Sequence, residues 1–564
     1  MTWTNRPLER VRPLAGRVLR GLRLLPDPAA EEIPGVHVTA GDDDGEAPLG
    51  ADLFVNPIAE GADPYVVRDG EHYLWVQTDG DVGVAIWRSD RLTSLGERHL
   101  VWRAPETGPV SKQVWAPELI QLDGRWHIYF AASDGRNENH LAYVLVADSD
   151  DPLGSYSLHG PFNTGDGEGG TADNAWAIDM SVLEHGGRRY AVWSGWPDAE
   201  TRVQKLYIAE METPTELRTQ RVQLASPFDY PWERIRDDAP NAINEAPQPL
   251  VHGGRTFLVY SCGSALLPSY KLGLLELVGN DPLDPDAWRK KPEPLFTSTE
   301  TTFGVGHSSF VLSPDGTEWW HAYHAKIVPE RNFKRVIQVQ PMSWSAEGEP
   351  VLGEPVCAGA PLRVPSGTTL APRRDTSAWD FASGADGLAD FDYYGHKQYV
   401  ALEPDGLHLG RIPAKPVNAY RSAEKILLRD GDYADVRVTA RFRVARGSRA
   451  VGILLRVTGP SVGVDSQRGY FAAWVPKTGR LVLRRSNGRT STELGSVAAP
   501  TPPTTDAVLV VEAVGTTLSV RLEHAPESRL AVQDDRYPRG SVGLRVVGSH
   551  AVFDSFSVEP IDTA

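Results

Sequence analysis

Apolar and aromatic residues recur with turn residues in a pattern that repeats five times along the first two thirds of the chain. Each unit has a short β run, a glycine-containing turn and an aromatic-rich β run, as in DPYVVRDGEHYLWVQTDG from Asp63. The equivalent turn glycines are Gly70, Gly124, Gly187, Gly254 and Gly316, spaced 54, 63, 67 and 62 residues apart. Asp-Gly and Gly-Gly pairs between β-type runs strongly predict hairpins.

Each unit continues into a third β run, such as VGVAIWRSDRL or QKLYIAEMETPTEL, and most units add a shorter fourth. Three or four strands per unit, repeated five times, predict a five-bladed β-propeller over residues 49–360. A row of β-sandwiches is the competing architecture. It would require a closed core in every repeat, and about 60 residues is thin for that.

Two further regions flank the predicted propeller. Residues 1–48 are predicted to be an N-terminal extension, basic first and acidic afterwards, to which the pattern assigns no fold; a packed arm is the alternative. A turn-rich linker is expected over 361–375. Alternating runs such as DVRVTARFRVA then predict an antiparallel β-sandwich over 376–564, so the fold class is all-β.

Composition and charge narrow the function classes. The chain has 564 residues, of which 41% are apolar, and a net charge of -17, which argues against a nucleic-acid or anionic-membrane partner. No apolar run approaches the roughly 20 residues that span a bilayer. Cys262 and Cys357 form neither a disulfide framework nor a metal-type spacing. Arginines and Pro13 interrupt the N-terminal apolar stretch, so we expect no signal peptide and a cytoplasmic protein.

Three carboxylates stand out when the repeats are aligned on their turns. Asp63, Asp179 and Glu245 lie seven, seven and eight residues before the glycine that begins the turn of their own unit. The innermost strands of a propeller line its central channel, so these residues are expected at equivalent depth around one axis. A single aspartate would be read as a turn cap or an arginine partner, and three in register favour a shared site.

Glycoside hydrolysis is the chemistry that three such carboxylates suit. It needs a protonated acid for the leaving oxygen and an ionised base or nucleophile. A third carboxylate can raise the pKa of the acid by like-charge repulsion. The residues alone leave the three roles open.

The motifs GADPYVV, VWAPELI, AIDMSVL, NEAPQPL and GVGHSSF, together with DPLGSY, cover about residues 55–350. The region they span resembles family 43 glycoside hydrolases, five-bladed propellers of the arabinofuranosidase and xylosidase group. The resemblance implies inverting hydrolysis, with Asp63 as general base, Asp179 as pKa modulator and Glu245 as general acid. An inverting enzyme holds base and acid about 6.5–9.5 Å apart, leaving room for water.

The same resemblance implies two further contacts near the channel centre. His307 matches a family histidine that contacts a bound calcium ion or a water, so calcium is left open although no cofactor is expected to be required. Arg335 matches a family arginine that reaches the sugar in the −1 pocket, with Arg331 and Lys334 as competing candidates nearby.

Other residues are expected to shape the pocket. Trp115 could form an apolar wall for the sugar, although it could equally be a packing aromatic between blades. Trp176 and Asn244 flank the catalytic positions. Glu118 also lies near the start of an inner strand, in a phrase that is mainly structural in the family, and ranks below the three carboxylates. The acidic, glycine-rich segment 165–174 is expected to be a loop at the channel rim.

The C-terminal region ends in GSVGLRVVGSHAVFDSFSV, which is similar to concanavalin-like carbohydrate-binding modules. If it binds sugar, exposed aromatics would supply the stacking surface, and the candidates are Tyr393, Tyr394, Tyr399 and Trp474. If it is structural, the same aromatics pack in its core and it buttresses the propeller.

The sequence therefore predicts an inverting, exo-acting α-L-arabinofuranosidase whose partner is an oligosaccharide or polysaccharide. The alternatives are a β-D-xylosidase or another furanosidase, acting on galactofuranose or D-arabinofuranose, and a non-catalytic sugar-binding propeller. A retaining fructan or sucrose hydrolase is a further rival, but its nucleophile phrase begins Asn-Asp-Pro, whereas Ala62 precedes Asp63 here.

Overall fold

The computed structural model describes residues 47–166, 174–235, 242–384, 387–412, 423–500 and 506–562. Residues 1–46 of the expected N-terminal extension and residues 167–173 of the expected loop at 165–174 therefore lie outside the described residues. Within these ranges no helix is long and apolar enough to cross a membrane. The helical turns are η1 (Asn137–Asn139), η2 (Pro231–Glu233), η3 (Pro285–Ala287) and η4 (Lys397–Tyr399). The all-β class is confirmed.

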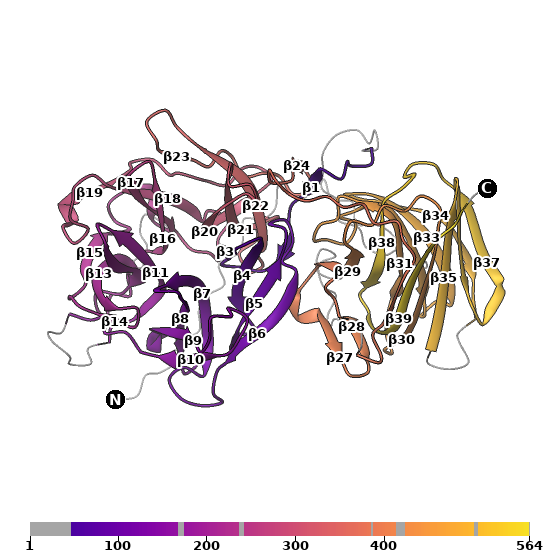
Figure 1. Cartoon of the computed structure of the whole chain (residues 1–564), viewed down its shortest axis with the longest axis horizontal. Coiled ribbons are helices and arrows are strands. Elements are labelled where there is room, and N and C mark those ends of the chain that lie inside the picture. Colours follow the sequence, from indigo (N-terminus) through magenta and orange to yellow (C-terminus); the bar gives the residue numbers. More distant parts are fainter. Residues whose placement is uncertain are drawn as a thin grey trace, which may run out of the picture. The chain divides into compact units, whose positions relative to one another are not determined.

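Five antiparallel sheets form the blades of a propeller (Figure 1). Blades 1 and 2 are made of β3 (Tyr65–Asp69), β4 (His72–Thr78), β5 (Gly83–Ser89) and β6 (Glu97–Arg103), then β7 (Lys112–Leu122), β8 (Arg125–Ser133), β9 (Leu141–Ala147) and β10 (Tyr156–His159). Blade 3 is made of β11 (Ala177–His185), β12 (Arg188–Gly195), β13 (Lys205–Thr213), β14 (Glu216–Leu217) and β15 (Val222–Ala225). Blade 4 is made of β16 (Asn244–His252), β17 (Arg255–Cys262), β18 (Lys271–Leu277) and β19 (Trp288–Lys290).

Blade 5 is closed by a strand from the other end of the domain. It contains β20 (Phe303–Leu312), β21 (Trp319–Lys326), β22 (Val336–Trp344) and β23 (Pro350–Val351). Its remaining strand is β2 (Ala59–Glu60), which precedes blade 1 and pairs with β22. Pairing a strand that precedes blade 1 with the last blade closes the ring, and the sequence pattern did not reveal this strand.

The predicted hairpins are confirmed. In every blade the innermost strand pairs with the second strand across the predicted turn. The five turn glycines have φ between 58° and 79°. This left-handed region is accessible to glycine without steric cost, which explains why glycine recurs there.

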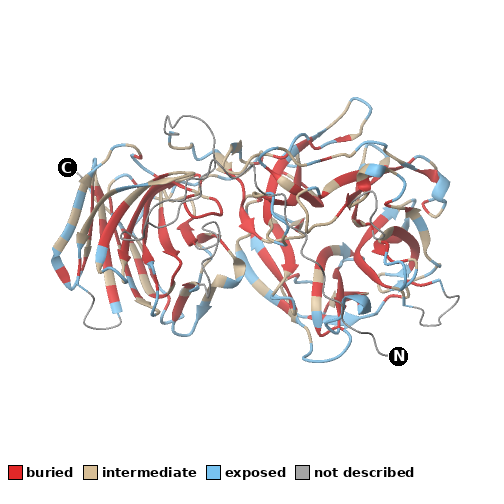
Figure 2. Ribbon diagram, turned by 180° about the vertical axis from the view of Figure 1, so that it is seen from behind, coloured by how far each residue is buried: buried red, intermediate tan, exposed pale blue. Residues whose placement is uncertain are grey.

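Apolar cores lie between neighbouring blades rather than inside them. Trp75 of blade 1 packs with Trp320 of blade 5, and Trp193 of blade 3 packs with residues of blade 2. Comparable clusters join blades 1 and 2, 3 and 4, and 4 and 5. Figure 2 shows buried residues along the blade strands and exposed residues at many hairpin ends. Each blade thus needs its neighbours, as expected for a propeller.

The C-terminal region contains two large antiparallel sheets. One has the order β27-β28-β39-β30-β35-β36-β37, with β25 also on β39, and the other has the order β26-β29-β38-β31-β32-β33-β34. The first sheet comprises β25 (Ser377–Asp380), β27 (Val400–Glu403), β28 (Gly406–Gly410), β30 (Val436–Val444), β35 (Asp506–Val514), β36 (Thr517–Leu522), β37 (Ala525–Gln533) and β39 (His550–Pro560). The second comprises β26 (Phe391–Tyr394), β29 (Ala423–Leu428), β31 (Ala450–Thr458), β32 (Arg468–Val475), β33 (Arg480–Asn487), β34 (Ser491–Ala498) and β38 (Ser541–Val547).

An apolar core lies between these two sheets, with Phe442 and Phe553 from one and Ile453 and Leu483 from the other. In the expected linker, β24 (Pro361–Arg363) pairs with β1 (Leu53–Val55).

The aromatics expected to stack on sugars are not an exposed platform. Trp474 and Tyr394 are buried, and Trp474 belongs to the core between the sheets. The hydroxyl of Tyr393 donates to the carbonyl of His396 at 2.6 Å and also lies against the carboxyl of Glu424. Tyr399 is half-buried, and its ring stacks on His396. These side chains are committed to packing, which favours the structural alternative for them.

Candidate active site

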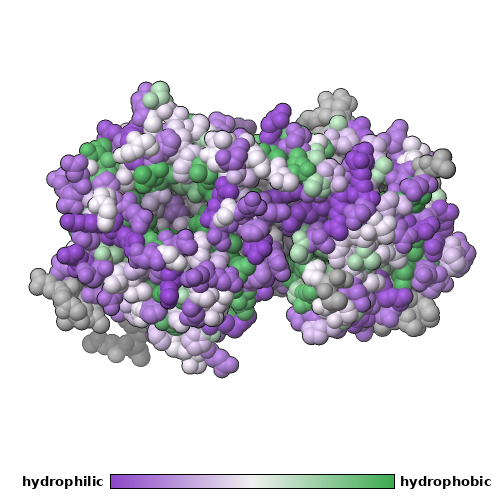
Figure 3. All heavy atoms as spheres, in the orientation of Figure 1, coloured by the Kyte–Doolittle hydropathy of each residue, from purple (hydrophilic) through white to green (hydrophobic). Residues whose placement is uncertain are grey.

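Three carboxylates from three blades line one cavity of about 360 Å³. Asp63 lies just before β3, Asp179 lies in β11 and Glu245 lies in β16. The same cavity is lined by Trp115, Trp176, His307 and Arg335. The structure thus brings together seven of the eight residues that the sequence placed in the site. In the view of Figure 3 the propeller is hollowed near its centre.

Each blade has a left-handed residue at an equivalent position near the start of its innermost strand. These residues are Asp63, Ala116, Asp179, Ala246 and His307, with φ between 45° and 55°. Such a conformation costs a non-glycine residue about 1–3 kcal/mol and persists where the surroundings impose it. Its recurrence around the channel shows that Asp63 and Asp179 are structurally equivalent, whereas the equivalent of blade 4 is Ala246 and not Glu245.

The left-handed residue lets two successive side chains face the same cavity. Regular strands send successive side chains to opposite faces, but the strand registers shift at this point in blades 2, 3, 4 and 5. In blade 3, Ile178 and Asp179 both line the cavity, and so do Trp115 and Ala116 in blade 2. Glu245 therefore reaches the cavity from the position before Ala246. The three carboxylates are therefore not at the equal depth expected from the sequence. Glu245 lies one residue before Ala246, the position equivalent to Asp63 and Asp179.

Asp63 is held as a carboxylate by three neighbours. Arg335 Nη1 donates to Oδ1 at 2.8 Å, and the Nδ1 atoms of His324 and His307 lie 3.1 and 3.3 Å from the same oxygen. Burial on its own would raise the pKa of Asp63, but Arg335 and the two histidines outweigh burial and lower that pKa well below its usual range. An ionised carboxylate at neutral pH suits a general base.

Glu245 is held in the opposite protonation state. Burial is the largest influence and raises the pKa of Glu245 to about 7, and the negative charge of Asp63 adds to this effect. A hydrogen bond from Tyr270 and the positive charge of Arg335 oppose it. The Tyr270 hydroxyl donates to Oε1 at 2.7 Å. A carboxyl that keeps its proton to near neutrality suits a general acid.

Asp179, the third carboxyl of the cavity, has a raised pKa like Glu245. Burial raises its pKa well above the usual range, and the carboxylates Glu245 and Asp63 raise it further. The backbone N–H of Ala246 donates to Oδ2 at 3.0 Å and partly opposes the rise. For Glu245, burial is a larger cause of the raised pKa than repulsion between carboxylates.

The comparisons with known proteins agree with this geometry. The model of a family described as glycosyl hydrolases family 43 matches residues 54–350, more than half of the chain. The chain belongs to this family.

This family 43 hydrolase is also similar to individual proteins. An extracellular exo-α-(1→5)-L-arabinofuranosidase of Streptomyces avermitilis is 30% identical over 350 residues, covering 58% of this chain and 69% of the relative. The enzyme of the same name from Streptomyces chartreusis is 31% identical, covering 50% and 84%. A crystal structure of an α-L-arabinofuranosidase from Lactobacillus brevis is 32% identical, covers 54% and 98%, and has a TM-score of 0.49.

The predicted location needs correction. Both Streptomyces relatives of the family 43 hydrolase are named extracellular, so the prediction of a cytoplasmic protein is wrong. That prediction depended on an interrupted apolar stretch near the N-terminus, and such a pattern does not decide where a chain acts.

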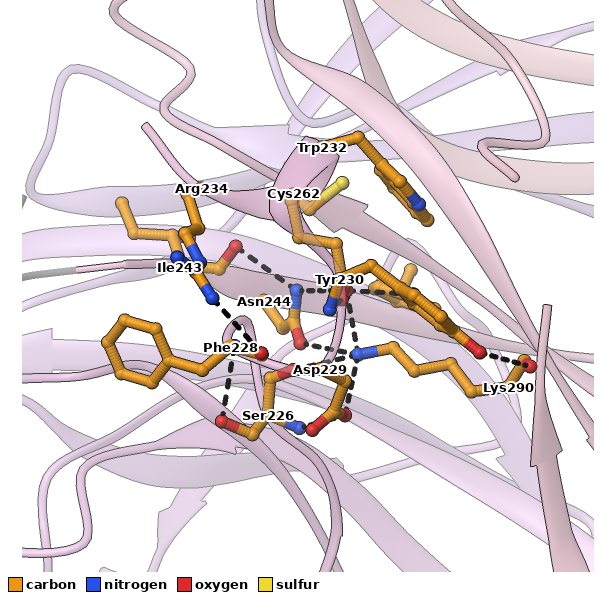
Figure 4. A network of polar contacts seen from close by, with 12 residues as sticks. Ser226, Phe228, Asp229, Tyr230, Trp232, Arg234, Ile243, Asn244, Cys262 and Lys290 are labelled. Carbon is orange, nitrogen blue, oxygen red and sulfur yellow. Dashed lines mark hydrogen bonds and ion pairs between the residues drawn. The ribbon is translucent and has the colours of Figure 1, made fainter. Parts of the chain in front are cut away.

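Asn244 is the expected site residue that lies elsewhere. Its amide donates to Glu233 Oε1 at 3.0 Å, and Lys290 Nζ donates to its carbonyl oxygen at 3.3 Å, in the network shown in Figure 4. Because Glu245 faces the cavity, the preceding side chain of the strand faces away from it. In this family 43 hydrolase Asn244 therefore fastens η2 to blade 4, and Lys290 Nζ lies 2.7 Å from Glu233 to complete the network.

A second set of buried polar residues adjoins the carboxylates. Glu118, Ser181 and Gln248 each lie two residues after a left-handed residue, and all three are buried. Gln248 Nε2 donates to Ser181 Oγ at 3.0 Å and to Glu118 Oε2 at 3.4 Å. Burial raises the pKa of Glu118 to about 8, although hydrogen bonds from Ser181 and Gln248 oppose the rise. Glu118 does not line the cavity but adjoins Asp179.

Stacked aromatic pairs build the cavity wall. The ring of Trp115 stacks on His140 at a centroid distance of 3.9 Å, and Trp176 stacks on Trp196 at 4.3 Å. The indole N–H of Trp176 also donates to the carbonyl of Asn137 at 2.7 Å. These contacts hold both tryptophan faces rigid, as a sugar-binding wall requires.

The residues near His307 do not fit direct calcium binding. Calcium takes six to eight oxygen ligands. The carboxylate beside His307 is Asp63, which is already paired with Arg335. Across the described ranges, no group of three or more His, Cys, Asp or Glu residues could hold a metal ion. His307 instead contributes to the electrostatic environment of Asp63.

The pKa shifts predict the pH dependence of this family 43 hydrolase. We expect kcat/KM to fall as pH rises through about 7, because Glu245 must carry its proton to act as the acid. The acid limb should lie below the ordinary aspartate pKa of about 3.9, because Arg335 keeps Asp63 ionised. A pH series of kcat/KM measures both limbs, with thermal unfolding at each pH as the control. A flat profile from pH 5 to 9 would contradict this assignment.

Proposed function

We propose that this chain is an inverting, exo-acting α-L-arabinofuranosidase. The observation that carries the proposal is the contrast between two carboxyls in one cavity. Arg335 and two histidines keep Asp63 ionised, whereas burial keeps Glu245 protonated to about neutral pH. When the surroundings lower the pKa of one carboxyl and raise the pKa of the other, the first can act as the base and the second as the acid.

The reaction follows from these two states. Asp63 takes a proton from a water molecule as its oxygen attacks the anomeric carbon. The glycosidic C–O bond breaks, and Glu245 gives its proton to the departing sugar oxygen. Attack from the face opposite the leaving group inverts the anomeric configuration. Arg335, which contacts Asp63, is positioned to reach the sugar in the same cavity.

Two observations support exo action on arabinofuranosides. Glu118, Ser181 and Gln248 form a buried, hydrogen-bonded cluster beside Asp179, which favours a blind pocket that admits a chain end. Both Streptomyces relatives carry names that specify exo-α-(1→5)-L-arabinofuranosidase. Oligosaccharides or polysaccharides with terminal α-L-arabinofuranose are therefore the proposed substrates, and the names of the relatives also favour export of the enzyme.

The test uses the full chain with a panel of 4-nitrophenyl glycosides and with an arabino-oligosaccharide. We expect the α-L-arabinofuranoside to have the highest kcat/KM and NMR to show the β-anomer as the first product. A preference for the β-D-xyloside or for the galactofuranoside would show that the enzyme acts on that sugar instead of α-L-arabinofuranose. Release of the α-anomer first would exclude inversion. Binding without turnover of any glycoside would indicate a non-catalytic propeller.

A further inference from the structure

A buried tyrosine outside the expected set of site residues contacts the proposed acid. Tyr270 precedes β18 and is fully buried. Its hydroxyl donates to Glu245 Oε1 at 2.7 Å. Sequence reasoning did not identify Tyr270, because it lies in a connection between two strands, 25 residues after Glu245.

The ring of Tyr270 is fixed from two sides. It stacks on His324 with a centroid distance of 5.4 Å and an interplanar angle of 11°. On β20, a Cβ at Gly306 would lie 2.3 Å from Cε1 of Tyr270, so a side chain there would displace the ring. The same histidine lies 3.1 Å from Asp63 Oδ1. The proposed acid and the proposed base thus share one rigid support made of Tyr270 and His324.

The hydrogen bond distinguishes the two oxygens of Glu245. Oε1 accepts from Tyr270, whereas Oε2 has no hydrogen bond to any residue in the part of the chain that the structure describes. A proton carried on Oε2 is therefore the one free to reach a substrate in the cavity. When that proton leaves, the Tyr270 hydroxyl stabilises the carboxylate that remains, because charge-assisted hydrogen bonds are stronger than neutral ones.

We propose that Tyr270 is a positioning residue for the acid, which selects Oε2 as the proton-donating oxygen and stabilises the carboxylate formed by proton transfer. The inference rests on the proposed role of Glu245 as general acid. In this role Tyr270 does not contact the substrate.

The expected pH effect depends on every charged or titratable group near Glu245. Asp63 and Asp179 are acidic neighbours, Arg335 is a cation, Cys262 of β17 is a further titratable neighbour besides Tyr270, and His307 lines the same cavity. Of these groups, Tyr270 and Arg335 lower the pKa of Glu245. Removing the tyrosine hydroxyl removes one lowering contribution, so the pKa of Glu245 rises and the alkaline limb of kcat/KM moves to higher pH.

The experiment compares Tyr270→Phe with wild type in the full chain. Phenylalanine keeps the ring that stacks on His324 and removes the hydroxyl alone. We expect the alkaline limb to move up by about one pH unit, since a hydrogen bond to a charged group has that strength. We also expect kcat to fall about tenfold on an arabino-oligosaccharide, and less on 4-nitrophenyl α-L-arabinofuranoside, whose leaving group needs less protonation, with KM little changed in both.

Tyr260→Phe is the matched control. Tyr260 is also a fully buried tyrosine of blade 4, and its hydroxyl donates to a different glutamate, Glu233, at 2.9 Å. Its replacement should leave the alkaline limb in place. Thermal unfolding of both variants checks that each is folded at the assay temperature.

The outcomes are distinguishable from a failure of the proposed function. An active wild type whose alkaline limb is unchanged by Tyr270→Phe, or a loss of equal size on both substrates, would overturn the positioning role. A wild type inactive on every glycoside would overturn the proposed function, and the positioning role with it.

Discussion

Replacing Glu245 with glutamine should lower kcat/KM on an arabino-oligosaccharide by about 10²–10⁴-fold. Glutamine has nearly the same size and can still accept the hydrogen bond that Tyr270 donates to Oε1. It carries no transferable proton, so the departing sugar oxygen would leave as an alkoxide. Initial rates with the full chain, alongside thermal unfolding, measure the loss and confirm that the variant is folded.

The leaving group provides a sharper test of the acid role. With an aryl glycoside whose phenol is strongly acidic, departure needs little protonation, so Glu245→Gln should lose much less activity than on the oligosaccharide. Glu184→Gln is the control, because Glu184 lies at the exposed end of β11 and pairs with Arg189. Equal losses on both substrates would contradict general-acid catalysis by Glu245.

Asp63→Asn should lower kcat/KM by about 10²–10⁴-fold as well, with a different dependence on substrate. Asparagine cannot take the proton of the attacking water, and water must be activated whatever the leaving group. The loss should therefore be similar on the oligosaccharide and on the activated aryl glycoside. The same rate measurements on both substrates separate this pattern from that of Glu245→Gln.

Asp123→Asn is the control for two features of Asp63→Asn, namely asparagine in a left-handed backbone position and the loss of a carboxylate that pairs with an arginine. Asp123 also has a left-handed φ, 53°, and its carboxylate accepts two hydrogen bonds from Arg189 at an exposed hairpin turn. Asparagine tolerates left-handed backbone, so both variants should fold. Retention of more than a tenth of wild-type activity by Asp63→Asn would remove Asp63 from the role of base.

The repeat and its hairpins were predictable because their signals are local. A glycine with positive φ between two β runs specifies a turn within a few residues, and the same turn occurs in all five blades. Closure of the ring was not predictable in the same way. The strand β2 has two residues, and its partner β22 lies nearly 280 residues later, so no local pattern marks the pairing.

The sequence was enough to predict which carboxylates form the site. It was not enough to predict where each of them lies. Aligning the repeats found Asp63, Asp179 and Glu245, which share one cavity. The one-residue offset of Glu245 became explicable only when the structure showed left-handed backbone at Ala246. The same alternation of strand side chains sends Asn244 away from the cavity, which sequence proximity to Glu245 could not reveal.

The all-β class, the five repeated hairpins and the three acidic side chains could be predicted from the sequence, because turn chemistry and residue type are local properties. The protonation state of each carboxyl could not, because it depends on the tertiary structure. Arg335 and His324 reach Asp63 from 272 and 261 residues away, and Tyr270 reaches Glu245 from a connection between strands. A pKa depends on burial and on neighbours in space, and only the closed ring of blades brings those neighbours together.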